Sequence, residues 1–302
     1  MGEVGLFAPS YYKQFGCIKG ECKHSCCIGW EIDIDDATLQ KYASLEGEMG
    51  QRIRESISYE GDVHFELSCG RCPHLDGGGL CRIISSLGED CISEICRLHP
   101  RFFNDTVRGR EVGLGMSCEE ACRIILSSDG YAEMEKIGEA EALESEFEAV
   151  TLRKELYSVL SAREKPYSER ICEICERFSV STELLSDGEW REVIESLEYL
   201  DEGSRELFSH YSSDACKLDD VRLERAFAYF VYRHTSGAKS LLEFRTGLGL
   251  ALFLSRLLAS LVISKGAVSD GEWIELARLI SEEIEYSTDN SDAIISEFEL
   301  LI

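Results

Sequence analysis

The chain has 302 residues and a formal net charge of −26, from 57 acidic and 31 basic residues. Hydrophobic residues make up 44% and there are only 4 prolines, which excludes global disorder and favours a helix-rich protein of one large or two modest domains. An acidic surface repels phosphate backbones and the chain has no Lys/Arg-rich run, so no nucleic-acid partner is expected.

The first fifteen residues, MGEVGLFAPSYYKQF, lack the basic segment and long apolar stretch of a secretory signal. We therefore expect a cytoplasmic protein, in a reducing compartment where stable disulfides are rare. The most hydrophobic stretch, 247–264, carries Arg256 near its centre. A charge there costs about 2.5–3.5 kcal/mol on membrane insertion, so the pattern predicts a buried helix and no membrane insertion.

The first part of the chain, residues 1–122, holds eleven of the 14 cysteines and many turn signals, among them the GGG at 77–79. Alternating apolar and acidic residues predict a half-buried strand over 30–35. Asp35 or Asp36 then caps a helix over 36–49. One or two helical turns are expected within 80–90 and a strand over 111–117. These features predict a loop-rich cysteine-cluster region.

From about residue 118 the pattern becomes helical, because strong helix formers and apolar residues recur at spacings of three and four. Helices are predicted over 118–128, 133–150, 151–162, 168–178, 221–235, 240–266 and 269–287, with a last one from 291. The fold class predicted is therefore mainly α. A cysteine-rich metal- or cluster-binding region (1–122) packs on a helical-bundle region (123–302).

The stretch CIKGECKHSCC, 17–27, places four cysteines in eleven positions. The expected compartment argues against disulfides, which leaves metal binding. Zinc takes paired hooks such as Cys69–Cys72, and His74 lies close by in sequence. Iron–sulfur ligation instead needs thiolates that converge from several loops. The spacing does not match the C-x3-C-x2-C motif of radical enzymes, and zinc and iron–sulfur both remain open.

Four cysteines have a plainer explanation. Cys122 falls on an amphipathic helix, which favours a packing role, and Cys216 is expected to be a buried or partly buried thiol. Cys172 and Cys175 lie three residues apart on a predicted helix, a spacing that arises more often by coincidence than as a metal hook.

The segment YYKQFGCIKGECKHSCCIGWEIDID resembles the start of the flagellin lysine-N-methylase family, part of a broader group of CxxCxxCC zinc- or iron-chelating proteins. The likeness continues through RCPHLDGGGLCRIISSLGED, ICRLHPRFFN and LGMSCEEACRIIL. It is weaker in RAFAYFVYRH and LISEEIEYSTDNSD, and it covers most of the chain.

This resemblance implies an iron–sulfur cluster, of the [4Fe–4S] type, with zinc as the alternative. It also implies S-adenosylmethionine as methyl donor and the ε-amino group of lysines on a flagellin-like protein as acceptor. The shared cysteines map to Cys17, Cys22, Cys26, Cys27, Cys72, Cys81, Cys96 and Cys118. Eight thiols exceed the four that one cluster needs, so either a second metal binds or several thiols have another role.

Methyl transfer requires a lysine to lose its proton, from a reference pKa of about 10.4, before it attacks a methyl sulfonium. Aromatic faces stabilise such cations, and Tyr12 and Trp30 are candidates near the cysteines. Arg97 and Arg101 are candidates to pair with the charge of a cluster or with a carboxylate. Further aromatic candidates, each more consistent with a core position, are Tyr11, Phe102, Phe103, Tyr229 and Tyr232.

No residue is singled out as the catalytic base, and no glycine-rich nucleotide loop is present. GLGLALF, 247–253, lies within an apolar helix and lacks a preceding strand. The predicted function is methyl transfer to protein lysine. Two alternatives stay open: a metal-binding or redox-sensing cysteine-cluster protein without methyltransferase activity, and a related cluster enzyme that modifies another peptide.

Overall fold

The computed structural model describes residues 3–141, 145–181 and 184–300, which fold as two compact units. The cysteine unit consists of Gly16–Pro100 with Cys118–Glu120. The helical unit consists of Met1–Phe15, Arg101–Ser117 and Ala121–Ile302. These bounds differ from the predicted division after residue 122, because segments on both sides of the cysteine unit supply strands to the helical unit.

The cysteine unit is built from short elements. Its helices are α1 (Asp36–Ser44), α2 (Gly47–Glu55), α3 (Arg82–Leu87) and α4 (Glu94–Leu98), with 3-10 turns η2 (Lys19–Glu21) and η3 (Glu89–Cys91) and a hairpin of β2 (Ile57–Ser58) and β3 (His64–Phe65). Asp35 caps α1 as predicted, accepting the backbone N–H of Thr38 at 2.9 Å. The predicted helix over 36–49 is divided, because Leu45 adopts an extended conformation between α1 and α2.

The predicted strand over 30–35 exists only as an extended segment. Ile32 and Ile34 are buried in alternation, as predicted. The N–H of Ile34 donates to the carbonyl of Val63, and the N–H of Phe65 donates to that of Ile32. The segment forms a single isolated bridge, between Asp33 and His64, and therefore extends the small hairpin without forming a regular strand.

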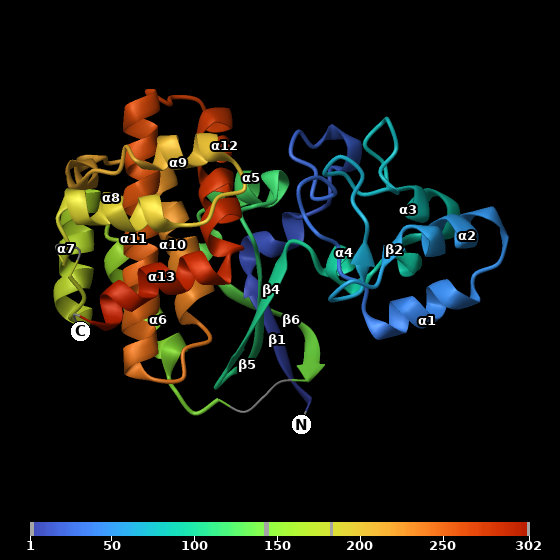
Figure 1. The fold of residues 1–302 in the computed structure, drawn as a ribbon. Coiled ribbons are helices and arrows are strands. Elements are labelled where there is room, and N and C mark those ends of the chain that lie inside the picture. Colours follow the sequence, from blue (N-terminus) through green and yellow to red (C-terminus); the bar gives the residue numbers. More distant parts are fainter. Residues whose placement is uncertain (1–2, 142–144, 182–183, 301–302) are drawn as a thin grey trace. The chain divides into compact units, whose positions relative to one another are not determined.

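The helical unit contains a four-stranded sheet in the order β4 (Arg101–Thr106), β5 (Gly109–Leu114), β1 (Glu3–Pro9) and β6 (Met134–Glu141) (Figure 1). The β5–β1 pair is parallel and the other two pairs are antiparallel. The predicted helix over 133–150 is therefore wrong for 134–141, where pairing with β1 overrides the helix propensity of the Glu, Lys and Ala residues. Residues 142–144 of that prediction lie outside the described residues.

Most of the helical unit is α-helical, which confirms the mainly α class. After α5 (Glu119–Ser127) come α6 (Ala149–Leu160), α7 (Tyr167–Phe178), α8 (Asp187–Ser196), α9 (Glu202–Phe208), α10 (Val221–Thr235), α11 (Leu241–Lys265), α12 (Asp270–Ile280) and α13 (Thr288–Glu299). The predicted α10 agrees residue for residue, and α11 and α12 start as predicted at good caps. One π-helical turn, η6 (Ser281–Glu285), joins α12 to α13.

Helix α11 forms the centre of the helical unit and contacts α10, α12 and α13 (Figure 1). By length and composition it could cross a membrane, but 89% of its most apolar window is buried within the protein, as predicted for a core helix. Gly247 allows α10 to approach closely, since a Cβ there would lie 2.2 Å from the carbonyl oxygen of His234.

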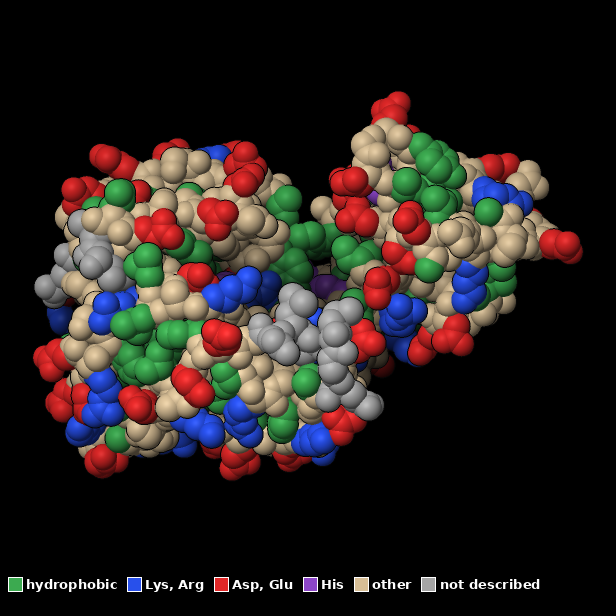
Figure 2. All heavy atoms as spheres, turned by 90° about the horizontal axis from the view of Figure 1, so that it is seen from below, with side chains coloured by type: hydrophobic (Ala, Val, Ile, Leu, Met, Phe, Trp, Pro, Cys, Tyr) green, Lys and Arg blue, Asp and Glu red, His purple; other side chains and the backbone are tan. Residues whose placement is uncertain are grey.

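Acidic side chains are scattered over the face shown in Figure 2, with Lys and Arg side chains between them. Many exposed charges of the protein form pairs, such as Lys13 with Glu135 at 2.6 Å and Lys165 with Glu173 at 2.7 Å. Exposed pairs of this kind contribute at most about 1 kcal/mol each, so the surface charge has little influence on the fold.

Candidate metal centre

All eight cysteines implied by the family resemblance belong to the cysteine unit. Cys118 is included although the chain on either side of Cys118–Glu120 belongs to the helical unit. Exposure differs among them: Cys17 and Cys26 are exposed, Cys72 is buried, and the rest are half-buried. Residues up to a hundred positions apart in sequence are thus placed in one compact body.

Four of these thiols share the small core of the cysteine unit. Cys72 is a buried member of that core, and Cys27, Cys81 and Cys96 pack against it. Each comes from a different segment: the N–H of Cys72 donates to the carbonyl of Cys27 at 2.8 Å, Cys81 precedes α3 as its N-cap, and Cys96 lies in α4. Four separate segments therefore bring one thiol each to the same core.

The adjacent thiols Cys26 and Cys27 shift each other's pKa values in opposite directions. A hydrogen bond from Cys26 lowers the pKa of Cys27 to about 7, with help from Ser25 and Arg71 and against the opposing effect of burial. The same hydrogen bond, together with burial, raises the pKa of Cys26. At neutral pH a substantial fraction of Cys27 is therefore thiolate, the form that binds metals.

The other core thiols favour the neutral form. Burial raises the pKa of Cys72 to about 12 and that of Cys96 to about 11, and the charges of Cys27 and Cys81 add to both shifts. Burial also raises the pKa of Cys81. Ionising all four thiols together requires a compensating positive charge, which a bound metal supplies.

Cys22 and Cys118 form a second group with Glu119. The thiol of Cys22 donates to the carbonyl of His24 at 3.1 Å and lies 3.5 Å from Oε2 of Glu119. That carboxylate also accepts the N–H of Lys23 at 2.8 Å. Burial raises the pKa of Cys22 to about 11, and Glu119 and Cys118 add to the shift. Within the predicted set of eight, Cys72, Cys81 and Cys96 therefore lie around Cys27, whereas Cys22 and Cys118 lie together beside Glu119.

Two glycines bring the first cysteine loop against the loop that precedes Cys81. A Cβ at Gly20 would lie 2.7 Å from the carbonyl oxygen of Gly78, so only glycine fits there. Asp76 fixes the second loop, its Oδ1 accepting the N–H groups of Gly78 and Leu80 at 2.8 Å each. The glycines therefore permit loop-to-loop contact.

The donor set fits a thiolate-ligated metal in number and chemistry, because one cluster or one zinc ion takes four thiols, and Cys27, Cys72, Cys81 and Cys96 share one core. Over the described ranges, no three Cys, His, Asp or Glu side chains already form a group that could hold a metal ion. His74 keeps a nitrogen ligand available: its Nδ1 is buried without a partner, and its Nε2 lies 2.9 Å from Ser56 Oγ.

The cysteines outside the set of eight are dispersed. Cys91 is buried in the core of the cysteine unit, while Cys69 is exposed. Cys122 is fully buried, as predicted for a packing residue. Cys172 is exposed and Cys175 is half-buried on α7, and Cys216 is half-buried.

The four residues predicted to bind the methyl donor divide equally between the units. Tyr12 and Arg101 lie together in the helical unit: Nε of Arg101 donates to the Tyr12 hydroxyl at 2.8 Å, and its guanidinium lies 5.5 Å from the centre of the Phe15 ring. Trp30 and Arg97 belong to the cysteine unit, where Trp30 is half-buried and Arg97 pairs with Glu94 at 3.7 Å. Among the weaker candidates, Tyr11, Tyr229 and Tyr232 are buried core residues as expected, whereas Phe102 is half-buried and Phe103 is exposed, which contradicts the expected core position of Phe103.

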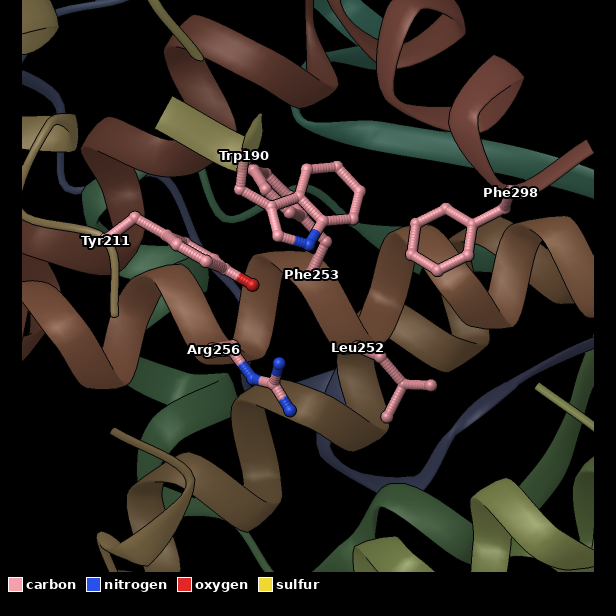
Figure 3. Close-up of a pocket in the computed structure, with 6 residues that line it drawn as sticks. All are labelled: Trp190, Tyr211, Leu252, Phe253, Arg256 and Phe298. Atoms are coloured by element: carbon pink, nitrogen blue, oxygen red, sulfur yellow. The ribbon is translucent and has the colours of Figure 1, made fainter. Parts of the chain in front are cut away.

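Two cavities in the helical unit escaped the sequence reasoning. The smaller has a volume of about 10 Å³ and is lined by Trp190, Tyr211, Leu252, Phe253, Arg256 and Phe298 (Figure 3). It is a packing void among stacked rings, too small for a ligand. The larger, about 720 Å³, has charged walls, but Arg222 there pairs with Asp220 at 2.7 Å and with Asp270 at 2.9 Å. Its charges are thus largely neutralised by one another.

No protein-family model matches the chain and no solved structure matches it. Among curated proteins, the chain is 28% identical over 145 residues to the lysine-N-methylases of Salmonella typhimurium (strain LT2) and Salmonella choleraesuis (strain SC-B67). The match covers 45% of this chain and 36% of each relative, so the chain spans about a third of the length of these lysine-N-methylases.

A further relative is shorter. The chain is 30% identical over 145 residues to the flagellar biosynthetic protein FliU of Salmonella muenchen, and the match covers 45% of this chain and 86% of that protein. Nearly the whole of FliU therefore has a counterpart here. On this similarity, and with the cysteine pattern gathered in one unit, the chain belongs to the flagellin lysine-N-methylase family.

Proposed function

We propose that this protein is an iron–sulfur-containing methyltransferase that transfers a methyl group from S-adenosylmethionine to lysine side chains of a flagellin-like protein in the cytoplasm. The observation that carries the proposal is the relationship to proteins named lysine-N-methylase, together with the match over 86% of FliU. Placement of all eight family cysteines in one unit supports the metal part of the proposal.

The chain's own residues have separable roles in this proposal. Cys27, Cys72, Cys81 and Cys96 would hold a [4Fe–4S] cluster, because they share one core and arrive from four segments. A bound cluster would supply the positive charge that keeps these thiols ionised. Cys22 and Cys118 are then left for a second metal or for positioning their loops. Tyr12 and Arg101, which contact each other in the helical unit, are the proposed contacts for the methyl donor, whereas Trp30 and Arg97 of the cysteine unit stay predictions from the sequence.

Anaerobic purification followed by ultraviolet–visible and electron paramagnetic resonance spectra tests the cluster, alongside analysis of iron, sulfide and zinc. We expect iron and sulfide in equal amounts. Cys72→Ser and Cys81→Ser should lose most of the bound iron. Cys172→Ser is the matched control, since Cys172 lies exposed on α7 in the other unit. Stoichiometric zinc without sulfide would overturn the cluster.

Mass spectrometry tests the activity. Purified protein is incubated with S-adenosylmethionine and with a flagellin that carries surface lysines, and the lysine-containing peptides are searched for added methyl groups. Methylation that requires both the protein and S-adenosylmethionine supports the proposal. Methylation of other co-encoded proteins, with none on flagellin, would assign the same chemistry to another peptide.

A second candidate is a metal-binding or redox-sensing protein without methyltransferase activity. One observation favours it: two thiols lie side by side in sequence, Cys26 is exposed, and a hydrogen bond from Cys26 lowers the pKa of Cys27 to about 7, towards the reactive thiolate form. Calorimetry with S-adenosylmethionine separates the two functions, because a sensor of this kind should bind none.

A further inference from the structure

The helical unit contains a buried polar network that the sequence reasoning did not identify. Glu285 lies on the π-helical turn η6, and its side chain has no exposed surface. Its Oε1 lies 2.7 Å from Nε2 of His234, and its Oε2 accepts the Tyr229 hydroxyl at 2.9 Å. Both partners come from α10. Single π-helical turns often mark functional sites, which directs attention to this one.

The geometry fixes which nitrogen of His234 carries the proton. Burial raises the pKa of Glu285, but Arg233 and the hydrogen bond from His234 outweigh burial, so the pKa is lowered and the group is a carboxylate. A carboxylate only accepts hydrogen bonds, so Nε2 of His234 must be the donor. In the neutral ring the lone pair then lies on Nδ1.

Nδ1 of His234 has the access that a base needs. The side chain is 13% exposed, and Nδ1 forms no hydrogen bond with any described residue. Among the described residues, the fully buried polar atoms without a partner do not include this Nδ1, so the atom keeps some contact with solvent. One ring nitrogen is therefore held by a buried carboxylate while the other remains available. A base oriented by a third group in this way is the usual arrangement for proton transfer in active sites.

Glu285 is itself held on several sides. The hydroxyl of Tyr229 accepts the backbone N–H of Met116 at 3.1 Å, so its proton points to the carboxylate. Nε of Arg233 lies 3.4 Å from Oε1 of Glu285, and the Arg233 guanidinium lies 5.0 Å from the centre of the Phe102 ring. These contacts restrain the carboxylate and, through it, the imidazole ring.

A buried pair elsewhere in the same unit shows what a purely structural arrangement looks like. Arg153 and Glu111 are 2% and 1% exposed, and Arg153 also bonds Ser236, so neither side chain reaches solvent. The pair around Glu285 differs because its outer member, His234, is partly exposed and carries an unused acceptor. Because of that difference, Nδ1 of His234 could accept a proton from a molecule bound at the surface, which the Arg153–Glu111 pair could not.

Building on the function proposed above, we propose that His234 is the general base for methyl transfer and that Glu285 is its positioning residue. Nδ1 takes a proton from the lysine ammonium, leaving a neutral amine whose lone pair forms the new N–C bond with the methyl carbon of the sulfonium donor. The S–C bond breaks and its electron pair stays on sulfur, giving a neutral thioether and a methylammonium product. The imidazolium then releases its proton to water.

Replacement of His234 by glutamine is the sharpest test. The amide of His234→Gln can still donate to Glu285 but has no basic nitrogen, so folding should be preserved. Single-turnover methyl transfer to a flagellin with surface lysines should fall about 10²–10⁴-fold, the usual contribution of a general base. S-adenosylmethionine binding, measured by calorimetry, and iron content should remain those of the wild type. His210→Gln is the matched control, since His210 is an exposed histidine of the same unit.

Two additional variants separate catalysis from structure. His234→Ala should recover part of its rate when free imidazole is added, and a structural role would give no such rescue. Glu285→Gln should lower kcat while leaving KM for the protein substrate near the wild-type value. An active wild type with equally active His234→Gln and His234→Ala would overturn the base role alone. A wild type that methylates no lysine probe would overturn the proposed function and the base role with it.

Discussion

The two units differ in how they bury their apolar surface. In the helical unit, the 25-residue helix α11 is buried along most of its length, and aromatic rings such as Trp190 and Phe253 pack at 4.8 Å between centroids. In the cysteine unit the buried apolar core consists of eight residues from short elements: Ile32, Ile34, Tyr42, Ile53, Phe65, Cys72, Ile83 and Cys91. Two of those eight are cysteines.

This contrast shows that the units obtain their stability in different ways. The cysteine unit has fewer than a hundred residues and so small an apolar core that burial alone contributes little, and small domains with such cores often add disulfides or a metal. None of its described cysteines forms a disulfide, so the metal proposed above is the expected source of additional stability. The helical unit has long packed helices and does not need one. Five predictions test the comparison, from the largest expected effect to the smallest.

Removal of the proposed iron should loosen the cysteine unit and leave the helical unit unchanged. Because metal binding free energy becomes folding free energy in such units, amide hydrogen exchange in α1 and α3 should accelerate by about tenfold or more after chelation. Exchange in α10 and α11 should not change. Amide hydrogen exchange measured by mass spectrometry, with and without chelator, tests this prediction. Equal acceleration in both units would contradict the proposal that only the cysteine unit depends on a metal.

Glu224→Gln should destabilise the helical unit strongly. Glu224 is 1% exposed and accepts hydrogen bonds from Arg170 at 2.5 Å and from Tyr131 at 2.9 Å. Removing one charge of a buried pair costs about 3–5 kcal/mol, because the Arg170 charge stays buried without its partner. Denaturant unfolding followed by near-ultraviolet circular dichroism measures the loss, while iron content should match the wild type.

Glu224 also makes the folding stability of the wild type depend on pH in the acid range. Burial raises the pKa of Glu224, but hydrogen bonds from Arg163, Arg170 and Tyr131 outweigh burial, so its folded-state pKa is lowered. Its contribution is therefore complete above the unfolded pKa of about 4.3 and is lost as pH falls through the lower folded value. Below pH 4 the difference in stability between wild type and Glu224→Gln should shrink; a constant difference contradicts the assignment.

Gly247→Ala should push α10 and α11 slightly apart and lower the stability of the helical unit. The added Cβ would meet the His234 carbonyl oxygen at 2.2 Å, and backbone atoms on both sides cannot move independently. Overpacking of this kind costs about 1–3 kcal/mol. Gly271→Ala is the control, because its Cβ would meet nothing within 4 Å near the start of α12. A thermal unfolding midpoint lowered in both variants would show that steric contact is not the cause.

Asp35→Ala should have the smallest effect, confined to the cysteine unit. Asp35 accepts the N–H of Thr38 at 2.9 Å as the cap of α1, and also that of Glu94 at 2.9 Å, next to Cys96 in α4. Loss of a cap costs about 0.5–2 kcal/mol. Exchange should accelerate in α1 and α4 alone, and Asp35→Asn should recover most of the protection.

Sequence reasoning found what depends on local signals. The α10 bounds, the Asp35 cap and the burial of Cys122 follow from periodicity and capping chemistry. It missed β1 and β6 because their pairing joins residues such as Val4 and Ala140, which no local pattern connects. The pairing of His234 with Glu285 was missed for the same reason, since 51 residues separate them. The gathering of thiols is equally non-local and was expected only through the family resemblance.

The path of the chain through the two units has a consequence for synthesis. Strand β1 emerges from the ribosome well before its partners β5 and β6, because Leu6 pairs with Arg110 and with Gly138, more than a hundred residues later. Domains tend to fold in the order in which they are made. Residues 16–100 of the cysteine unit are therefore synthesised, and can begin to fold, while β1 still lacks both of its partner strands. The cysteine unit is therefore fully synthesised before β6, the last strand of the sheet, becomes available to the helical unit.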